Sequence, residues 1–247
     1  MNIKFNIDYR THWGESVYIG GDIPQLGNGK PEDAIKMVLH GEQSWEYNLQ
    51  LPDDIGEFDY FYIVKDETGK ERREWGKCHV FRPGGNAREY GIYDRWQDQP
   101  WDKPYYSVVF FDCICKRQNK AMPVTPSPGM LLISVDAPMI ASDHVLALSG
   151  SCDALGNWNV NDAIILSDAD YPTWKCSVPL SDLPSSFEYK FLILKKGTKE
   201  VVGWELLDNR IFDLSPATKG ECLLLNGLRF SNPQNNWRGA GVAIPVF

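Results

Sequence analysis

One short pattern of residues occurs twice in the 247-residue chain, and this repeat constrains the fold more than any other feature. The first copy reads Gly-Gly-Asp-Ile-Pro-Gln-Leu-Gly-Asn-Gly over residues 20–29, and the second reads Ser-Gly-Ser-Cys-Asp-Ala-Leu-Gly-Asn-Trp over residues 149–158. Each copy follows a short apolar run. Because self-similarity at a long period marks a repeated domain, we expect two copies of one domain, each roughly 100 residues long.

The match between the copies continues downstream of this pattern. Both contain a tryptophan, then an aromatic run, then a second tryptophan, in the same order. These are Trp45, residues 58–62 and Trp75 in the first copy, and Trp174, residues 187–191 and Trp204 in the second. We expect Trp45 and Trp174 to lie in the core because each begins a strand-like run.

Runs typical of β-strands dominate the sequence. Short segments rich in Val, Ile, Tyr, Phe and Trp are separated by clusters of Gly, Pro, Asp and Asn. They cover residues 16–20, 45–51, 60–65, 131–136, 145–149, 187–194 and 220–225. No long segment has helical periodicity. The sequence therefore predicts an all-β protein of two tandem immunoglobulin-like antiparallel β-sandwiches, with about seven or eight strands each.

The domain boundaries follow from composition. Residues 119–129 are polar and rich in proline, which predicts a fairly stiff linker between domains at 1–118 and 130–231. The first domain ends in a segment containing Trp96, Trp101, Tyr105 and Tyr106, and we expect these aromatic rings to hold an extended tail on the sandwich. The apolar residues 232–247 predict the start of a further, truncated domain.

The formal net charge of -8 excludes some classes of partner. Nucleic acids are bound through basic surfaces, and so are anionic membranes, so we expect neither as a partner. No apolar run approaches the ~18 residues of a membrane span. The N-terminal residues lack the apolar stretch of a signal peptide, which predicts a cytoplasmic protein. The six cysteines do not occupy equivalent positions in the two copies, so we expect them to be reduced and mostly buried.

Catalytic motifs are missing from the sequence. It contains no nucleophile elbow, no phosphate-binding loop and no His-Glu-x-x-His motif. Its four histidines lack metal-ligand spacing, and Cys113-x-Cys115 has no second pair of ligands. We therefore expect no catalytic residue, no metal ion and no cofactor in this chain.

The second copy resembles a family 20 carbohydrate-binding module, the starch-binding domain. The resemblance rests on Gly150-Ser, Leu155-Gly-Asn-Trp158, Pro172-Thr-Trp174, Phe187-Glu-Tyr-Lys-Phe191, Gly203-Trp-Glu205 and Asn209-Arg210, taken in this order. The first copy resembles a divergent module of the same family. This resemblance implies a β-sandwich that binds an α-1,4-glucan such as starch, glycogen or maltodextrin.

Both ends of the chain are similar to one class of enzyme. Residues 11–16 and 237–245 look like those of amylomaltase-type 4-α-glucanotransferases of glycoside hydrolase family 77, which carry two starch-binding modules ahead of the catalytic domain. This implies that the chain is a non-catalytic region that holds polysaccharide for a downstream catalytic domain, and that the parent chain transfers α-1,4-glucan segments.

The family resemblance also implies which residues bind the sugar. Trp158 and Trp204 match the stacking pair of the principal site, where a rigid indole covers the apolar face of a glucose ring. Lys190 and Asn209 match its hydrogen-bonding positions, and Glu205, which follows the second tryptophan, is expected to bind the sugar as well. Considered by itself, each tryptophan could instead belong to the core, Lys190 could be a solvated lysine and Asn209 could simply form a turn.

A second type of site in the family is built on aromatic residues, and its traces are uneven here. Tyr171 matches one such position, but the other falls near Ser142. In the first copy Trp13 matches the second type of site.

The principal site of the first copy is incomplete. Gly29 and Phe61 stand where Trp158 and Lys190 stand in the second copy, although Trp75 remains. We hypothesise that the first copy binds through Trp13 or packs on the catalytic domain. The alternative function is an interaction scaffold whose sandwiches pack on the catalytic domain or a partner subunit without binding glucan.

Overall fold

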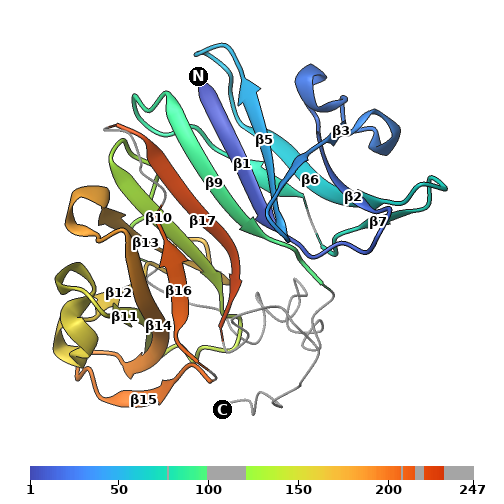
Figure 1. Ribbon diagram of the computed structural model, residues 1–247. Coiled ribbons are helices and arrows are strands. Elements are labelled where there is room, and N and C mark those ends of the chain that lie inside the picture. Colours follow the sequence, from blue (N-terminus) through green and yellow to red (C-terminus); the bar gives the residue numbers. More distant parts are fainter. Residues whose placement is uncertain (77, 99–120, 207, 215–219, 231–247) are drawn as a thin grey trace. The chain divides into compact units, whose positions relative to one another are not determined.

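The computed structural model describes residues 1–76, 78–98, 121–206, 208–214 and 220–230, and β-strands dominate it (Figure 1). These residues form two compact units, one of residues 1–98, 126–128 and 220–226 and the other of residues 121–125, 129–214 and 227–230. Within these ranges no helix is both long enough and apolar enough to cross a bilayer.

The first unit contains two sheets. One has the order β9–β1–β5–β4. Its strands are β1 (Asn2–Asp8), β4 (Val38–His40), β5 (Ser44–Gln50) and β9 (Glu89–Arg95). All its pairings are antiparallel except β1 with β9, which run parallel. The start of β17 (Cys222–Arg229) also pairs in parallel with β9, from Cys222 to Leu225.

The other sheet of the first unit has the order β3–β2–β6–β7, and β8 pairs with β6 as well. Its strands are β2 (Ser16–Gly21), β3 (Ile35–Lys36), β6 (Phe58–Lys65), β7 (Glu71–Arg73) and β8 (His79–Phe81).

The core of the first unit lies between its two sheets. Ile3, Phe5 and Ile7 on β1 are buried at every second position, as expected for a strand with one face in the core. The Phe5 ring lies 5.0 Å from the ring of Tyr60 on β6, so side chains of the two sheets meet. Trp45 is buried and its indole donates a hydrogen bond to the carbonyl oxygen of Tyr9 at 3.1 Å, which confirms its predicted place in the core.

The second unit repeats this strand order. β10 (Met130–Asp136) pairs antiparallel with β13 (Thr173–Pro179), as β1 pairs with β5. The other sheet has the order β12–β11–β14–β15, with β16 also on β14. Its strands are β11 (His144–Gly150), β12 (Ile164–Ile165), β14 (Ser186–Lys195), β15 (Val201–Trp204) and β16 (Arg210–Asp213). Trp174 is fully buried, so the prediction of a core residue is confirmed here too.

One edge of β14 pairs with two strands in succession, and this arrangement places the candidate site. β16 pairs with residues 186–189 and β15 pairs with residues 192–194, which leaves Lys190 and Phe191 at the junction. β6 has the same arrangement, with β8 on residues 58–60 and β7 on residues 63–65. Residues of the two units can therefore be matched strand by strand.

These observations confirm the predicted all-β class and every predicted strand. Trp96 is buried with its ring 4.6 Å from that of Tyr9, as expected for an aromatic residue that holds the tail on the sandwich. The predicted linker is described from residue 121 and forms no helix or strand there. Trp101, Tyr105, Tyr106 and residues 232–247 lie outside the described residues.

Candidate functional site

Four of the predicted site residues come together in the second unit. Trp158, Lys190, Trp204 and Asn209 line one open pocket of about 400 Å³. They come from three parts of the sequence: the turn after β11, the middle of β14, and the two ends of the segment that connects β15 with β16. The sequence had no direct signal of this proximity, which arises because β15 and β16 share one edge of β14.

Trp158 has an unusual backbone conformation. Gly156, Asn157 and Trp158 are all left-handed, with φ values of 78°, 47° and 63°. Glycine is required at 156, where a Cβ atom would lie 2.9 Å from the carbonyl group of Asp162. A bulky residue such as tryptophan seldom adopts φ above zero, and the strain costs roughly 1–3 kcal/mol. Backbone strain of this kind is typical of functional sites.

The two tryptophans form a tilted pair. Their ring centroids lie 6.5 Å apart and their planes meet at 55°. Trp204 is 36% exposed although it is a large apolar side chain, and Trp158 is half-buried. Two flat apolar faces inclined in this way suit a ligand whose own apolar faces turn from one unit to the next.

Polar groups complete the pocket. On β14 the neighbours Tyr189 and Phe191 are buried while Lys190 is half-exposed, so its ammonium group faces away from the core. The Asn209 side chain donates a hydrogen bond from Nδ2 to Oε2 of Glu188 at 2.8 Å, which fixes the amide beside β14. The pocket thus combines apolar faces with hydrogen-bonding groups at its edge.

Glu205 was expected to bind the ligand directly, but the structure places it behind the pocket. It is buried, and its carboxylate accepts hydrogen bonds from Nε and Nη2 of Arg210. Its Oε2 atom also accepts the backbone N–H of Phe191 at 3.3 Å. The carboxylate is turned inward because β15 ends at Trp204 and successive side chains of a strand point to opposite faces.

Arg210 remains charged in this buried position. Burial lowers the pKa of its guanidinium, but the hydrogen bonds and the negative charge of Glu205 outweigh burial, so the net pKa lies above the ordinary value. Arg210 therefore brings a positive charge to its contact with Glu205 inside the sandwich.

Tyr171 does not line the pocket. It is half-buried, its hydroxyl donates a hydrogen bond to the carbonyl oxygen of Pro138, and its ring lies 6.2 Å from that of Trp174. Ser142, the residue near the matching aromatic position, is an exposed serine. Tyr171 thus packs against the buried Trp174.

Matching β6 with β14 corrects the predicted role of Trp75. Leu192 pairs with Trp204, and the matching residue Ile63 pairs with Arg73. Arg73 therefore takes the place of Trp204, and Trp75 lies two residues further on. Arg73 and Trp204 are each followed by a glutamate, Glu74 and Glu205, and this shared glutamate is the sequence signal that matches the two positions. Both glutamates are buried, and both accept a backbone N–H from the central strand.

The corresponding surface of the first unit has a different chemistry. Gly29, with a φ of 78°, matches Trp158, as predicted from the sequence. The guanidinium of Arg73 lies over the ring of Phe61, 3.8 Å from its centroid, and Nη2 donates to Sγ of Cys78 at 3.1 Å. Since Phe61 and Cys78 take the places of Lys190 and Asn209, Arg73 covers the position where a ligand would stack.

A buried polar cluster lies beneath this surface. Asp94 accepts hydrogen bonds from the hydroxyls of Tyr60 and Tyr62 at 2.9 and 2.7 Å, and burial together with the Asp94 charge raises the pKa of both tyrosines well above the ordinary value. Nε2 of His79 lies 2.9 Å from Oε1 of Glu74. His79 and Glu74 thus match Arg210 and Glu205 of the second unit.

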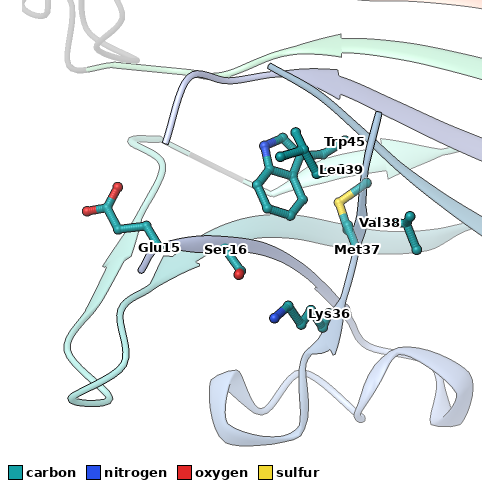
Figure 2. A pocket seen from close by; sticks show the side chains of 7 residues that line it. All are labelled: Glu15, Ser16, Lys36, Met37, Val38, Leu39 and Trp45. Carbon is teal, nitrogen blue, oxygen red and sulfur yellow. The ribbon is translucent and has the colours of Figure 1, made fainter. Parts of the chain in front are cut away.

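The first unit also has an open groove (Figure 2). Its volume is about 550 Å³, and its lining residues are Glu15, Ser16, Lys36, Met37, Val38, Leu39 and Trp45. Figure 2 shows the side chains of Leu39 and Trp45 lying together on one side of the groove. Trp13 is fully exposed and stands two residues before Glu15, but it is not one of the lining residues.

Metal-binding groups are missing from the described parts of both units. No group of three or more His, Cys, Asp or Glu side chains in these ranges is arranged to hold a metal ion.

Comparison with known proteins identifies a family for most of the chain. The family model of the starch binding domain matches residues 1–90 and 132–221. A 4-α-glucanotransferase of rice (Oryza sativa subsp. japonica) is 27% identical over 100% of this chain, which spans 28% of the length of that enzyme. An α-amylase of Streptomyces violaceus is 33% identical over 30% of this chain and 13% of its own length.

Solved structures were compared as well. The family 20 carbohydrate-binding module of a maltotetraose-forming amylase from Pseudomonas saccharophila is 23% identical, with a TM-score of 0.32, over 39% of this chain and 99% of the module. A glucoamylase of Hypocrea jecorina is 21% identical, with a TM-score of 0.37, over 42% of this chain and 18% of that enzyme.

Proposed function

The chain belongs to the starch binding domain family, which it represents in two successive copies, and on this basis we propose that it binds α-1,4-glucan at the pocket of the second unit. The observation that carries the proposal is the tilted pair Trp158 and Trp204, with Lys190 and Asn209 in the same pocket.

The chemistry of the pocket fits this ligand. A glucose ring has an apolar face of C–H groups and a rim of hydroxyls, so it is recognised by an aromatic plane together with hydrogen-bonding groups at its edge. Successive glucose units of an α-1,4 chain turn relative to one another. Trp158 and Trp204, inclined at 55°, can each cover one unit, while Lys190 and Asn209 bind hydroxyls.

Binding at one such pocket is expected to be weak. An affinity of ~1 mM corresponds to about -4 kcal/mol, which is typical of a site with one or two stacking contacts. Weak binding suits a module that holds a polymer locally while the polymer slides or is exchanged.

We further propose that the parent protein is a 4-α-glucanotransferase and that this region holds polysaccharide for a catalytic domain outside the chain. The rice relative supports this proposal because the similarity extends over the whole chain. The cytoplasmic location expected from the sequence stays a prediction.

A second contact for glucan is proposed at Trp13 in the first unit. The Trp13 side chain is fully exposed, so it has no role in the core. The flat apolar face of its indole is therefore open to stack on a glucose ring. The principal site of this unit is not a candidate because Arg73 covers Phe61 there.

Isothermal titration with β-cyclodextrin tests the main proposal. We expect heat of binding from the unmodified chain, no measurable heat from Trp158→Ala or Trp204→Ala, and an unchanged affinity in the control Val178→Ala, because Val178 lies outside the pocket. If the folded chain gives no heat, the scaffold alternative is favoured. Equal heat from all variants would place the binding site elsewhere.

A further inference from the structure

A buried ion pair lies directly behind the proposed glucan pocket. We propose that Glu205 and Arg210 are positioning residues that hold Trp204 and Asn209 on the two sides of Lys190, so that the pocket is already formed before glucan binds. This inference rests on the proposed function of the pocket. It assigns to Glu205 a role different from the direct contact expected from the sequence.

Glu205 lies at the junction of two strand pairings on β14. β15 pairs with β14 as far as Leu192 and β16 begins at Tyr189, so Phe191 lies between the two ladders. Glu205 forms two hydrogen bonds with the backbone of Phe191 at this junction. Its backbone N–H donates to the carbonyl oxygen of Phe191 at 2.9 Å, and its carboxylate accepts the N–H of Phe191 at 3.3 Å. Trp204 is therefore fixed to the central strand by its own neighbour in sequence.

Arg210 connects the start of β16 to Glu205. Its guanidinium forms a bidentate contact with Glu205, five residues before it, and also donates from Nη2 to the carbonyl oxygen of Arg229 at 2.6 Å. A bidentate pair fixes the relative orientation of both side chains as well as their separation. The end of β15 and the start of β16 are thus held at a set spacing. Trp204 and Asn209 are the residues directly before Glu205 and Arg210, so the pair fixes their positions too.

Loosening the contact between Glu205 and Arg210 would be energetically costly. Both partners are buried, so a loosened contact would leave a charge without its partner inside the sandwich. The loop that connects β15 with β16 is exposed at Leu206 and Asp208. The pair therefore supplies the rigid support for two ligand-binding side chains that stand at the ends of an exposed loop.

The first unit provides a natural comparison. Glu74 lies at the matching junction on β6 and accepts the N–H of Tyr62 at 3.1 Å, but its partner is the imidazole of His79, which reaches it through Nε2 alone. The residues directly before Glu74 and His79 are Arg73 and Cys78, where the second unit has Trp204 and Asn209. The bidentate pair thus occurs in the copy that keeps the tryptophan and the asparagine.

Affinity and stability must be measured together to test this role. We would prepare Glu205→Gln, Arg210→Lys and the double variant, with Val178→Ala as the control. Val178 is buried on β13 of the same unit, and it lies outside the pocket. For each chain, urea unfolding gives the stability and titration with β-cyclodextrin gives the affinity.

We expect each single substitution to weaken β-cyclodextrin binding roughly tenfold, as removal of a charged hydrogen bond does. The double variant should be no weaker than the worse single variant, because the two residues act as one pair. Val178→Ala should lose stability while its affinity stays within about twofold of the unmodified chain.

Three results would overturn the inference. Glu205→Gln and Arg210→Lys could both bind as tightly as the unmodified chain. Val178→Ala could weaken binding as much as they do. Glu205→Gln and Arg210→Lys could both fail to fold while Val178→Ala folds, which would make the ion pair a support of the whole sandwich. Failure of the proposed function itself is distinct, because the unmodified chain would then bind no cyclodextrin.

Discussion

At the scale of single residues, Trp158 is the side chain whose position is hardest to explain without a ligand. Its φ of 63° lies in the same left-handed region as the φ of 78° at Gly29 in the matching turn of the first unit, where glycine adopts the conformation without strain. A tryptophan in such a turn lowers stability, so its presence is best explained by what its ring binds.

Replacing Trp158 with glycine should separate binding from stability. Trp158→Gly relieves left-handed strain of roughly 1–2 kcal/mol but loses the contacts of a half-buried ring, so the free energy of unfolding should change by less than about 1 kcal/mol while β-cyclodextrin binding is lost. Urea unfolding and titration measure the two quantities. For comparison, Trp174→Ala in the core should cost about 3–5 kcal/mol. A large stability loss in Trp158→Gly would show that the ring is structural.

The buried cysteines should be inert in the folded protein. Burial raises the pKa of the Cys176 thiol to about 12 and that of Cys222 to about 11, so almost no thiolate is present at pH 8. We expect both to resist maleimide until the protein is unfolded, whereas the half-buried Cys78 and Cys152 are accessible. Peptide mapping after brief labelling measures this. Fast labelling of Cys176 in the native chain would contradict its burial.

The family resemblance, which rests on residue types and their order, was enough to predict the four pocket residues but not the role of Glu205. A carboxylate beside a stacking tryptophan can face the ligand or the core, and only the strand register decides between them. Here the Phe191 N–H and Arg210 lie on the core side and hold the carboxylate there.

At the scale of elements, β6 and β14 each have one edge that pairs with two strands, and in each unit this edge determines how the surface is built. In the first unit the polar cluster of Asp94, Tyr60 and Tyr62 lies under this edge. The side chain of Asn226 donates to the same carboxylate of Asp94 at 3.2 Å. One buried acceptor therefore satisfies three donors.

Removing that acceptor should destabilise the first unit. Asp94→Ala leaves the hydroxyls of Tyr60 and Tyr62 and the amide of Asn226 without their acceptor, and we expect a loss of about 3 kcal/mol or more in the free energy of unfolding. Binding of β-cyclodextrin by the second unit should be unchanged. Urea unfolding followed by tyrosine fluorescence tests the first expectation and titration the second. A loss below about 1 kcal/mol would mean that the cluster contributes little.

Strand positions were predictable from the alternation of apolar and turn-forming residues, but the register of β7 was not. Arg73 and Trp75 are two residues apart, so the period of a strand places both on the same face. Sequence alignment favoured the tryptophan because it matched Trp204 in type. The pairing of Ile63 with Arg73 decides for the arginine.

At the scale of the whole molecule, one fold carries two different surfaces. The strand order is the same in both units, yet one unit presents two tryptophans and the other an arginine over a phenylalanine. Function therefore depends on a few side chains placed on a shared scaffold. The sequence repeat predicted the scaffold, and the differences between the copies predicted that they bind differently.

A polymer ligand should reveal any contribution from the first unit. If Trp13 makes a second contact, the two sites act together on one long glucan, so Trp13→Ala should weaken binding to soluble amylose by roughly tenfold or more while leaving β-cyclodextrin affinity unchanged. Affinity electrophoresis in amylose gels measures the first effect. Equal mobility of the variant and the unmodified chain would restrict glucan binding to the second unit.

The most direct measurement is an NMR titration that follows the indole N–H signals of the tryptophans while β-cyclodextrin is added. We predict large shifts for Trp158 and Trp204, together with the backbone amide of Asn209, and almost none for the buried Trp45 and Trp174. Shifts confined to other tryptophans, or no shifts at saturating ligand, would contradict binding at this pocket.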